Sequence, residues 1–322
     1  MSGPPSSLIE NYLREAGFWH AATIGRGCKL DPKLINALIE RWRPETHTFH
    51  LPCGECTITL EDIQLQLGLS VDGFALTGSV QSSDWEAICC DLLSVILNNI
   101  YGGRIEMAGY LMPDLSRNFV HLRWLLKLVD FRAAGELSWG SVVLATLYRE
   151  ICRATRSNKA KIRGCLLLLQ SWAQFRFPFL CPRANHPYTF PLITRWNHPA
   201  SYIGIPTAFE DIRLLLDQWS EAQMDTVLRQ FGFQQPIPKE PEVLDEQLKI
   251  DLQLTNTNWP LFWSEYIKFW ENQYDHIPDR EPIIVLELVC TPDYMPWFKI
   301  HGKPYLLLEQ QRRRQIRVER ER

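Results

Sequence analysis

Two cysteines separated by two residues, Cys53 and Cys56, are the first side chains whose spacing suggests chemistry. Thiolates spaced in this way can hold a zinc ion, and His47 and His50 lie close by in the sequence. A structural zinc site usually needs a second ligand pair, however, and the chain has no second C-x-x-C. We therefore expect no metal here and favour a structural pair of cysteines in a turn, with a zinc ligand pair as the alternative.

Six basic side chains close together in the sequence form a second candidate site. They are Arg149, Arg153, Arg156, Lys159, Lys161 and Arg163, here called the basic cluster. Cations near the C-terminal end of a helix interact favourably with its dipole, which gives the cluster a structural role. The cluster exceeds what a helix end requires, so a site for phosphate groups or for an acidic partner is the alternative.

A basic tail occupies residues 306–322. Its RRRQIR core resembles nuclear-import and nucleic-acid-binding segments, whereas its mixed charges fit a solvated helix equally well.

The local signatures that position catalytic groups are missing from the chain. It has no P-loop, no GxSxG elbow, no HExxH and no set of kinase loops. We therefore expect a protein that is not an enzyme and that binds no cofactor. A dispersed active site is the alternative, because such sites leave no linear trace.

The bulk composition predicts a folded protein inside the cell. The 322 residues are 46% hydrophobic and include 12 Trp and 15 Phe, which is ample material for a core. The net charge of −3 gives no overall attraction to phosphate backbones or anionic lipid. We also expect no export signal, no membrane span and a reducing compartment for the nine cysteines.

The elements around Cys53 are predicted by local signals. Residues 30–43 are expected to form a helix, with Asp31 as N-cap and Pro32 in the first helical position. Alternating residues then predict a small β-hairpin near residues 46–58. A second helix should begin with a capping box of Thr59 and Asp62 and end at Gly68.

Helical spacing dominates downstream, so the fold class is mainly α. The helices are expected at residues 85–100, 118–131, 139–156, 162–177, 220–231 and 261–273, and a capping box of Thr207 and Glu210 should start another. Ser138 is a candidate N-cap of one of them. The apolar run at 283–289 could be a strand or a buried helix. A Pro-rich segment, 178–206, suggests either one domain over residues 1–322 or two packed halves, about 1–180 and 207–305.

Several blocks of the sequence resemble one known family. They are LINALIERWRP, ETHTFHLPCGECTITLEDIQLQLGLSVDG, LSRNFVHLRWLLKLVD, LSWGSVVLATLYREICRA, GCLLLLQSWAQFRFP, VLRQFGFQQPIP and DYMPWFKIHGKPY. In this order they resemble the plant mobile domain, also called aminotransferase-like, over nearly the whole chain.

The resemblance implies a nuclear plant protein with a role in meristem maintenance, gene expression and transposon silencing. It implies partners among other plant mobile domain proteins or phosphatase-7-like proteins, and it transfers no catalytic residue. Neither an aminotransferase lysine nor the GDxHG, GDxVDRG and GNHE blocks of metallophosphatases can be picked out. The family can also carry Met at the position of Cys56, which argues against zinc. Direct nucleic-acid binding by a protein of transposon origin, through the basic cluster, is the alternative function.

Overall fold

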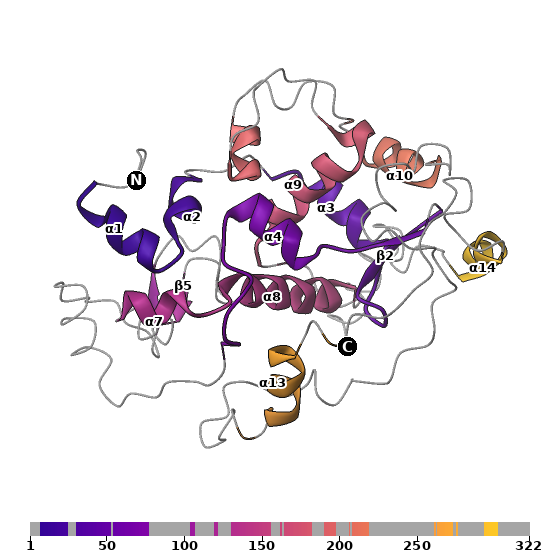
Figure 1. Ribbon diagram of the computed structural model, residues 1–322. Coiled ribbons are helices and arrows are strands. Elements are labelled where there is room, and N and C mark those ends of the chain that lie inside the picture. Colours follow the sequence, from indigo (N-terminus) through magenta and orange to yellow (C-terminus); the bar gives the residue numbers. More distant parts are fainter. Residues whose placement is uncertain are drawn as a thin grey trace, which may run out of the picture.

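Helices make up most of the part of the chain that the structure describes, with a small antiparallel sheet beside them (Figure 1). The computed structural model describes residues 7–24, 30–52, 54–76, 104–106, 119–121, 130–155, 162, 164–181, 190–197, 206, 208–218, 261, 263–272, 275 and 293–301. The predicted class, mainly α, is confirmed for this part of the chain. No helix within it combines the length and the apolar character that a membrane crossing needs.

The core is built on four helices, α3 (Pro32–Ile39), α4 (Leu60–Leu67), α8 (Trp139–Ala154) and α9 (Leu166–Arg176). Helix α4 packs on both α8 and α9, and α3 packs on α9. Residues Val143, Leu147 and Ile151 of α8 recur at helical spacing and are buried, as an amphipathic helix requires.

The predicted starts of α3 and α4 are confirmed. The Asp31 carboxylate accepts the backbone N–H of Lys33 at 2.9 Å, and Pro32 takes the first turn of α3. Thr59 and Asp62 form the full capping box of α4. Gly68 ends α4 in the left-handed conformation, with φ of 66°.

The predicted hairpin is part of a three-stranded sheet, β1 (Trp42–Arg43), β2 (Thr48–Leu51) and β3 (Gly54–Cys56), in that order. Trp42 was expected in a helix over residues 30–43, but α3 ends at Ile39 and Trp42 pairs with Phe49. Pro44 disfavours helical geometry in the residue before it. The Trp42 ring is fully buried, with its centroid 4.8 Å from that of Phe49.

The predicted helix at 118–131 is wrong at residues 119–121, which form a strand. Strand β5 (Phe119–His121) pairs antiparallel with β4 (Arg104–Glu106), and Phe131 begins the short helix α7 (Phe131–Gly135). A short apolar run has the same spacing in a strand and in a buried helix, so the pattern could not separate the two. His121, expected on a helix, therefore lies in a strand.

Two further helix starts differ from their predictions. Ser138 precedes α8 but makes no cap; its hydroxyl donates to the Val71 carbonyl at 2.7 Å and so ties the helix start to the chain after α4. Helix α9 begins at Leu166, four residues later than expected. Gly164 has a φ of +91° just before it, which helical geometry does not allow.

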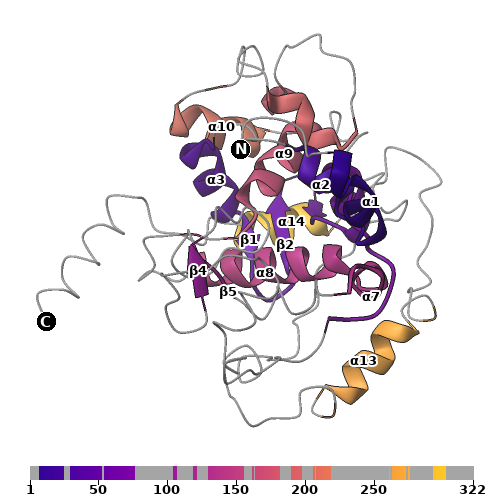
Figure 2. The ribbon, with the colours of Figure 1, turned by 90° about the vertical axis from the view of Figure 1, so that its left-hand side faces the viewer.

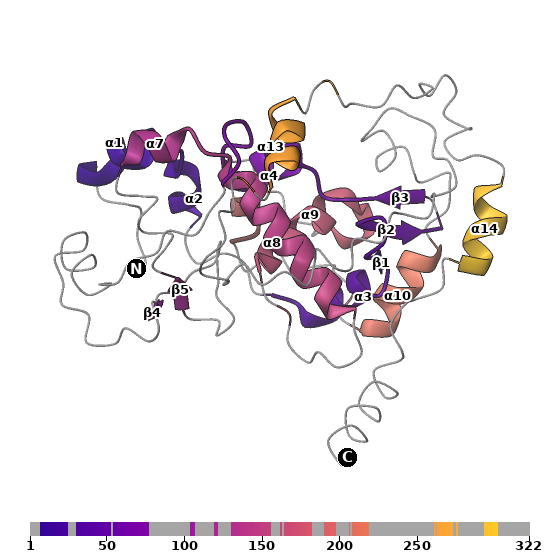
Figure 3. The same ribbon diagram turned by 90° about the horizontal axis from the view of Figure 1, so that it is seen from below.

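Helices α1 (Ser7–Glu15) and α2 (Trp19–Thr23) flank the core, and α1 lies beside α7 (Figures 1 and 3). The backbones of α1 and α7 approach closely. A Cβ atom at Gly135 would stand 2.1 Å from the Glu15 carbonyl oxygen, so only glycine fits there.

The Pro-rich segment contributes to the core through two short 3-10 helices, η1 (Pro178–Leu180) and η2 (Leu192–Asn197). Leu180, Ile193 and Trp196 are buried. Beyond them, α10 (Phe209–Gln218) packs on α3 (Figure 2). The division into two halves stays a prediction.

Two helices of the C-terminal third are described, α13 (Ser264–Glu271) and α14 (Tyr294–His301). Helix α14 lies near the sheet formed by β1 to β3 (Figure 3). The predictions for residues 85–100, 220–231, 283–289 and 306–322, and for the Thr207 cap, lie outside the described residues.

Candidate functional site

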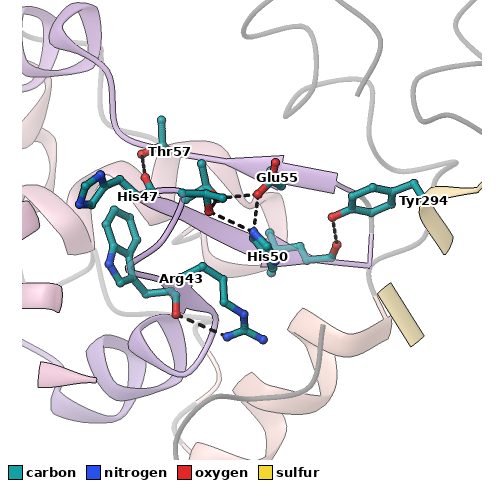
Figure 4. Close-up of polar contacts among 10 residues, drawn as sticks. Arg43, His47, His50, Glu55, Thr57 and Tyr294 are labelled. Atoms are coloured by element: carbon teal, nitrogen blue, oxygen red, sulfur yellow. Dashed lines mark hydrogen bonds and ion pairs between the residues drawn. The ribbon is translucent and has the colours of Figure 1, made fainter. Parts of the chain in front are cut away.

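A histidine and a glutamate face each other across the hairpin. His50 of β2 is paired in register with Glu55 of β3, and its Nε2 atom contacts Glu55 Oε1 (Figure 4). Thr48 Oγ1 donates to the same carboxylate oxygen at 2.7 Å, and Thr46 Oγ1 lies 3.3 Å from His50 Nε2. His50 is buried, so these polar groups are held in a fixed network.

The C-terminal helix α14 closes one end of this network. Tyr294 is fully buried and its hydroxyl donates to the Leu51 carbonyl at 3.3 Å (Figure 4). The Trp297 ring lies 5.4 Å from the His50 ring, centroid to centroid. Helix α14 thus covers this end of the hairpin, although the two are more than 200 residues apart in the sequence.

The other end of the hairpin is fixed by Tyr148 of α8. Its hydroxyl donates to the Ile58 carbonyl at 2.6 Å and also contacts the Thr57 hydroxyl. His47, which has a φ of 53°, stacks on the Tyr148 ring at 5.7 Å, and its carbonyl accepts from Thr57 at 2.8 Å. Burial raises the pKa of Tyr148 to about 12 and lowers the pKa of His47, so both are neutral at neutral pH.

The predicted cysteine pair is only partly described. Cys56 is buried in β3, and burial raises the pKa of its thiol far above the ordinary value, whereas a zinc ligand must be a thiolate. Cys53 lies outside the described residues. His50 contacts Glu55 and His47 stacks on Tyr148. Within the described ranges, no group of three or more His, Cys, Asp or Glu side chains is placed to hold a metal ion.

Of the basic cluster, Arg149 and Arg153 are described and both lie on α8; Arg156, Lys159, Lys161 and Arg163 lie outside the described residues. Arg153 Nη1 donates to Oε1 of Glu150 at 3.0 Å, and Glu150 is buried. The Nε atom of Arg149 is also buried. These two arginines are therefore partly used by the fold, and the side chain of Arg153 is 37% exposed.

A second set of charges attaches α10 to the first part of the chain. Arg213 Nε lies 2.9 Å from Glu40 Oε2, and Arg41 pairs with Asp217. Burial raises the pKa of Glu40, while the Arg213 and Arg41 charges lower it. Burial also lowers the pKa of Arg41 to about 10. These two ion pairs connect α10 to the end of α3.

The hairpin network joins β2, β3 and α14 through direct contacts. Trp297 and Tyr294 cover it, and His50 Nδ1 has no hydrogen-bond partner among the described residues. The sequence could have revealed the His50–Glu55 pair, because a two-residue hairpin connection places these side chains opposite each other.

The sequence identifies the family to which the chain belongs. The plant mobile domain matches residues 17–102 and 104–226, which covers the sheet, all four core helices and α10. The chain therefore belongs to the plant mobile domain family.

Three proteins of Arabidopsis thaliana are similar to it. The serine/threonine-protein phosphatase 7 long form homolog is 31% identical, over 92% of this chain and 28% of that protein. Protein MAINTENANCE OF MERISTEMS is 32% identical, over 58% of this chain and 45% of that protein. Protein MAIN-LIKE 1 is 28% identical, over 89% of this chain and 69% of that protein. The chain thus spans less than half the length of the first two. No solved structure matches it significantly.

Proposed function

We propose that this chain is a non-enzymatic protein-interaction module that works in the nucleus. It acts in meristem maintenance, in the regulation of gene expression and in transposon silencing. Its partners are other plant mobile domain proteins or phosphatase-7-like proteins. The observation that carries the proposal is the domain match over residues 17–226, together with the similarity to a protein named for the maintenance of meristems.

Several buried acidic side chains form ion pairs with arginines, and this pairing supports a role without catalysis. Asp62 pairs with Arg176 at 3.1 Å, Glu40 with Arg213 at 2.9 Å and Glu150 with Arg153 at 3.0 Å. Each of these pairs joins helices or stabilises a helix end. Catalytic acids and bases instead converge on a place that a substrate can reach.

The proposal is tested by affinity purification of the tagged chain from plant nuclei, followed by mass spectrometry. The test variant reverses Arg156, Lys159, Lys161 and Arg163 to Glu, and Arg153 is kept because it pairs with the buried Glu150. Arg149 is kept, because its Nε atom is buried and a carboxylate there would destabilise α8.

A control variant reverses Lys33 and Arg132 to Glu, two exposed cations elsewhere on the surface. We expect plant mobile domain or phosphatase-like proteins to copurify with the wild type and the control, and to be lost from the test variant. Recovery of no partner with the wild type would contradict the proposal.

Direct binding of nucleic acid through the basic cluster is the second candidate. The cluster has more cations than the end of α8 requires, which is the observation in its favour. Binding through phosphates must weaken steeply as salt rises, and Arg153→Glu must reduce it. If the chain binds neither DNA nor RNA at low salt, this function is excluded.

A further inference from the structure

A surface cavity of about 400 Å³ lies between the N-terminal helices and the end of α4, away from the hairpin. Its walls come from four parts of the chain, with Arg14 of α1, Trp19 and His20 of α2, Gln64 of α4, and Phe190. Nothing in the hairpin network or the basic cluster explains why these side chains converge.

Aromatic rings form the apolar walls of the cavity. The His20 and Phe190 rings meet edge to face with centroids 4.6 Å apart. Phe190 is 51% exposed, so its ring is a wall at the surface and not part of the core. Trp19 provides a second large ring. A planar ring entering the cavity would find partners for stacked or edge-to-face contacts.

A cation is held at the edge of these rings. The guanidinium carbon of Arg14 lies 4.6 Å from the centre of the Trp19 ring. Arg14 Nε donates to Oε1 of Glu10 at 2.9 Å, and Nη2 lies 2.8 Å from the same atom. A guanidinium has five N–H donors in a planar fork. Among the described residues, Glu10 occupies only the Nε and Nη2 side, so the Nη1 side can donate to a further acceptor, and stacking on Trp19 holds the guanidinium in place.

Glycines shape the space next to these groups. A Cβ atom at Gly68 would stand 2.4 Å from the Cβ atom of His20, so a larger residue would push His20 away. Gly17 has a φ of +75°, and a Cβ atom added there would meet no atom of the described residues within 4 Å apart from its chain neighbours. That side of the cavity is therefore open.

We propose that this cavity is an anchor pocket. It receives one aromatic side chain from a segment of a partner protein, while an acidic residue next to that aromatic pairs with Arg14. The inference rests on the proposed function, because it names the surface through which an interaction module would hold a partner.

The dimensions and the exposure favour a side chain over a free small molecule. Pockets for small ligands cover about 300–1,000 Å³ and bury most of the ligand. This cavity lies near the low end of that range, and the side chain of Arg14 is 53% exposed. Interfaces between proteins, in contrast, concentrate binding energy in aromatic anchors that fill such shallow pockets.

The test uses the full chain labelled with fluorotryptophan and observed by ¹⁹F NMR. The Trp19 resonance is the one that disappears in Trp19→Phe. The probes are the capped dipeptides N-acetyl-Asp-Tyr-amide, N-acetyl-Lys-Tyr-amide and N-acetyl-Asp-Ala-amide. We expect a saturable shift of the Trp19 resonance with the first, binding about two- to five-fold weaker with the second, and no shift with the third.

A pair of variants separates the pocket from the rest of the surface. Gln64→Phe places a ring at the cavity wall, and Glu61→Phe places the same ring on an exposed position of α4 that does not line the cavity. The shift should vanish in Gln64→Phe and persist in Glu61→Phe. The inference is overturned if Asp-Tyr leaves the Trp19 resonance unmoved, if Lys-Tyr binds as well as Asp-Tyr, or if Gln64→Phe still binds. None of these results affects copurification from nuclei, so the proposed function would stand or fall separately.

Discussion

Arg176, in the last turn of α9, places its Nη2 atom 3.1 Å from Oδ1 of Asp62, the residue that closes the capping box of α4. The other carboxylate oxygen, Oδ2, accepts the Thr59 backbone N–H at 2.9 Å. One carboxylate thus completes the start of α4 and also attaches it to α9. This side chain therefore links two of the core helices, α4 and α9, at the point where the chain leaves the sheet.

Replacing Asp62 should therefore cost more than removing a helix cap alone. Asp62→Ala leaves Arg176 without this partner, and we expect a loss of about 2–4 kcal/mol in the free energy of unfolding. Thr59→Ala should cost about 1 kcal/mol. Urea unfolding measures both, with the exposed Glu61→Ala as control. Equal losses for Asp62→Ala and Glu61→Ala would show that the link to α9 contributes nothing.

Tyr148 provides a second test, at the junction of α8 and the hairpin. Tyr148→Phe removes the donor to the Ile58 carbonyl and the contact with Thr57. We expect the free energy of unfolding to fall by about 1–2 kcal/mol, because the buried Ile58 carbonyl loses its hydrogen-bond donor. Tyr12→Phe is the matched control, since Tyr12 is 53% exposed. The control should change stability by less than about 0.5 kcal/mol. A loss of the same size in both variants would contradict the assigned role.

The attachment of α10 can be tested by exchanging charges. Arg213→Glu places two carboxylates together at a buried position and should destabilise the protein by about 2–4 kcal/mol. Adding Glu40→Arg restores a pair of opposite charges with their positions exchanged, and the protein should regain part of the lost stability. Thermal unfolding of the single and double variants gives the coupling free energy between residues 40 and 213. If the double variant is as unstable as the sum of the two single ones, the ion pair does not hold α10.

Glu40 also predicts a dependence of stability on pH. Burial raises the pKa of Glu40 above 4.5, so the folded protein binds this proton more tightly than the unfolded chain does. The stability that the folded protein gains from binding this proton is present in full below pH 4.5, and it is lost as the pH rises through the raised pKa. Glu40→Gln removes this titration. Measured by urea unfolding between about pH 4 and about pH 7, the stability of Glu40→Gln relative to wild type should therefore increase with pH. A constant difference would contradict the raised pKa.

Local signals in the sequence predicted the starts of α3 and α4 and the hairpin. Asp31, Thr59 and Gly68 act on residues within a few positions of themselves, so their roles could be inferred from spacing alone. The same rules were wrong at Phe119, where a short apolar run forms a strand, and at Ser138, whose hydroxyl binds Val71 instead of capping α8. In both cases a partner distant in the sequence decided the outcome.

The candidate site was harder to predict for the same reason. His50 and Glu55 lie close in sequence, and hairpin register could have paired them. Their cover by Trp297, and the convergence of Trp19 with Phe190, bring together segments more than 150 residues apart. No spacing rule connects such segments; only packing does.

The most direct test of the interaction module is the size and location of the native species. Plant cells are separated into nuclear and cytosolic fractions, and the tagged chain in each fraction is sized by gel filtration under native conditions. The proposal predicts a nuclear species well above the 37.6 kDa of the chain, with plant mobile domain or phosphatase-like proteins in the same fractions. A chain found only in the cytosol, eluting as a monomer, would contradict it.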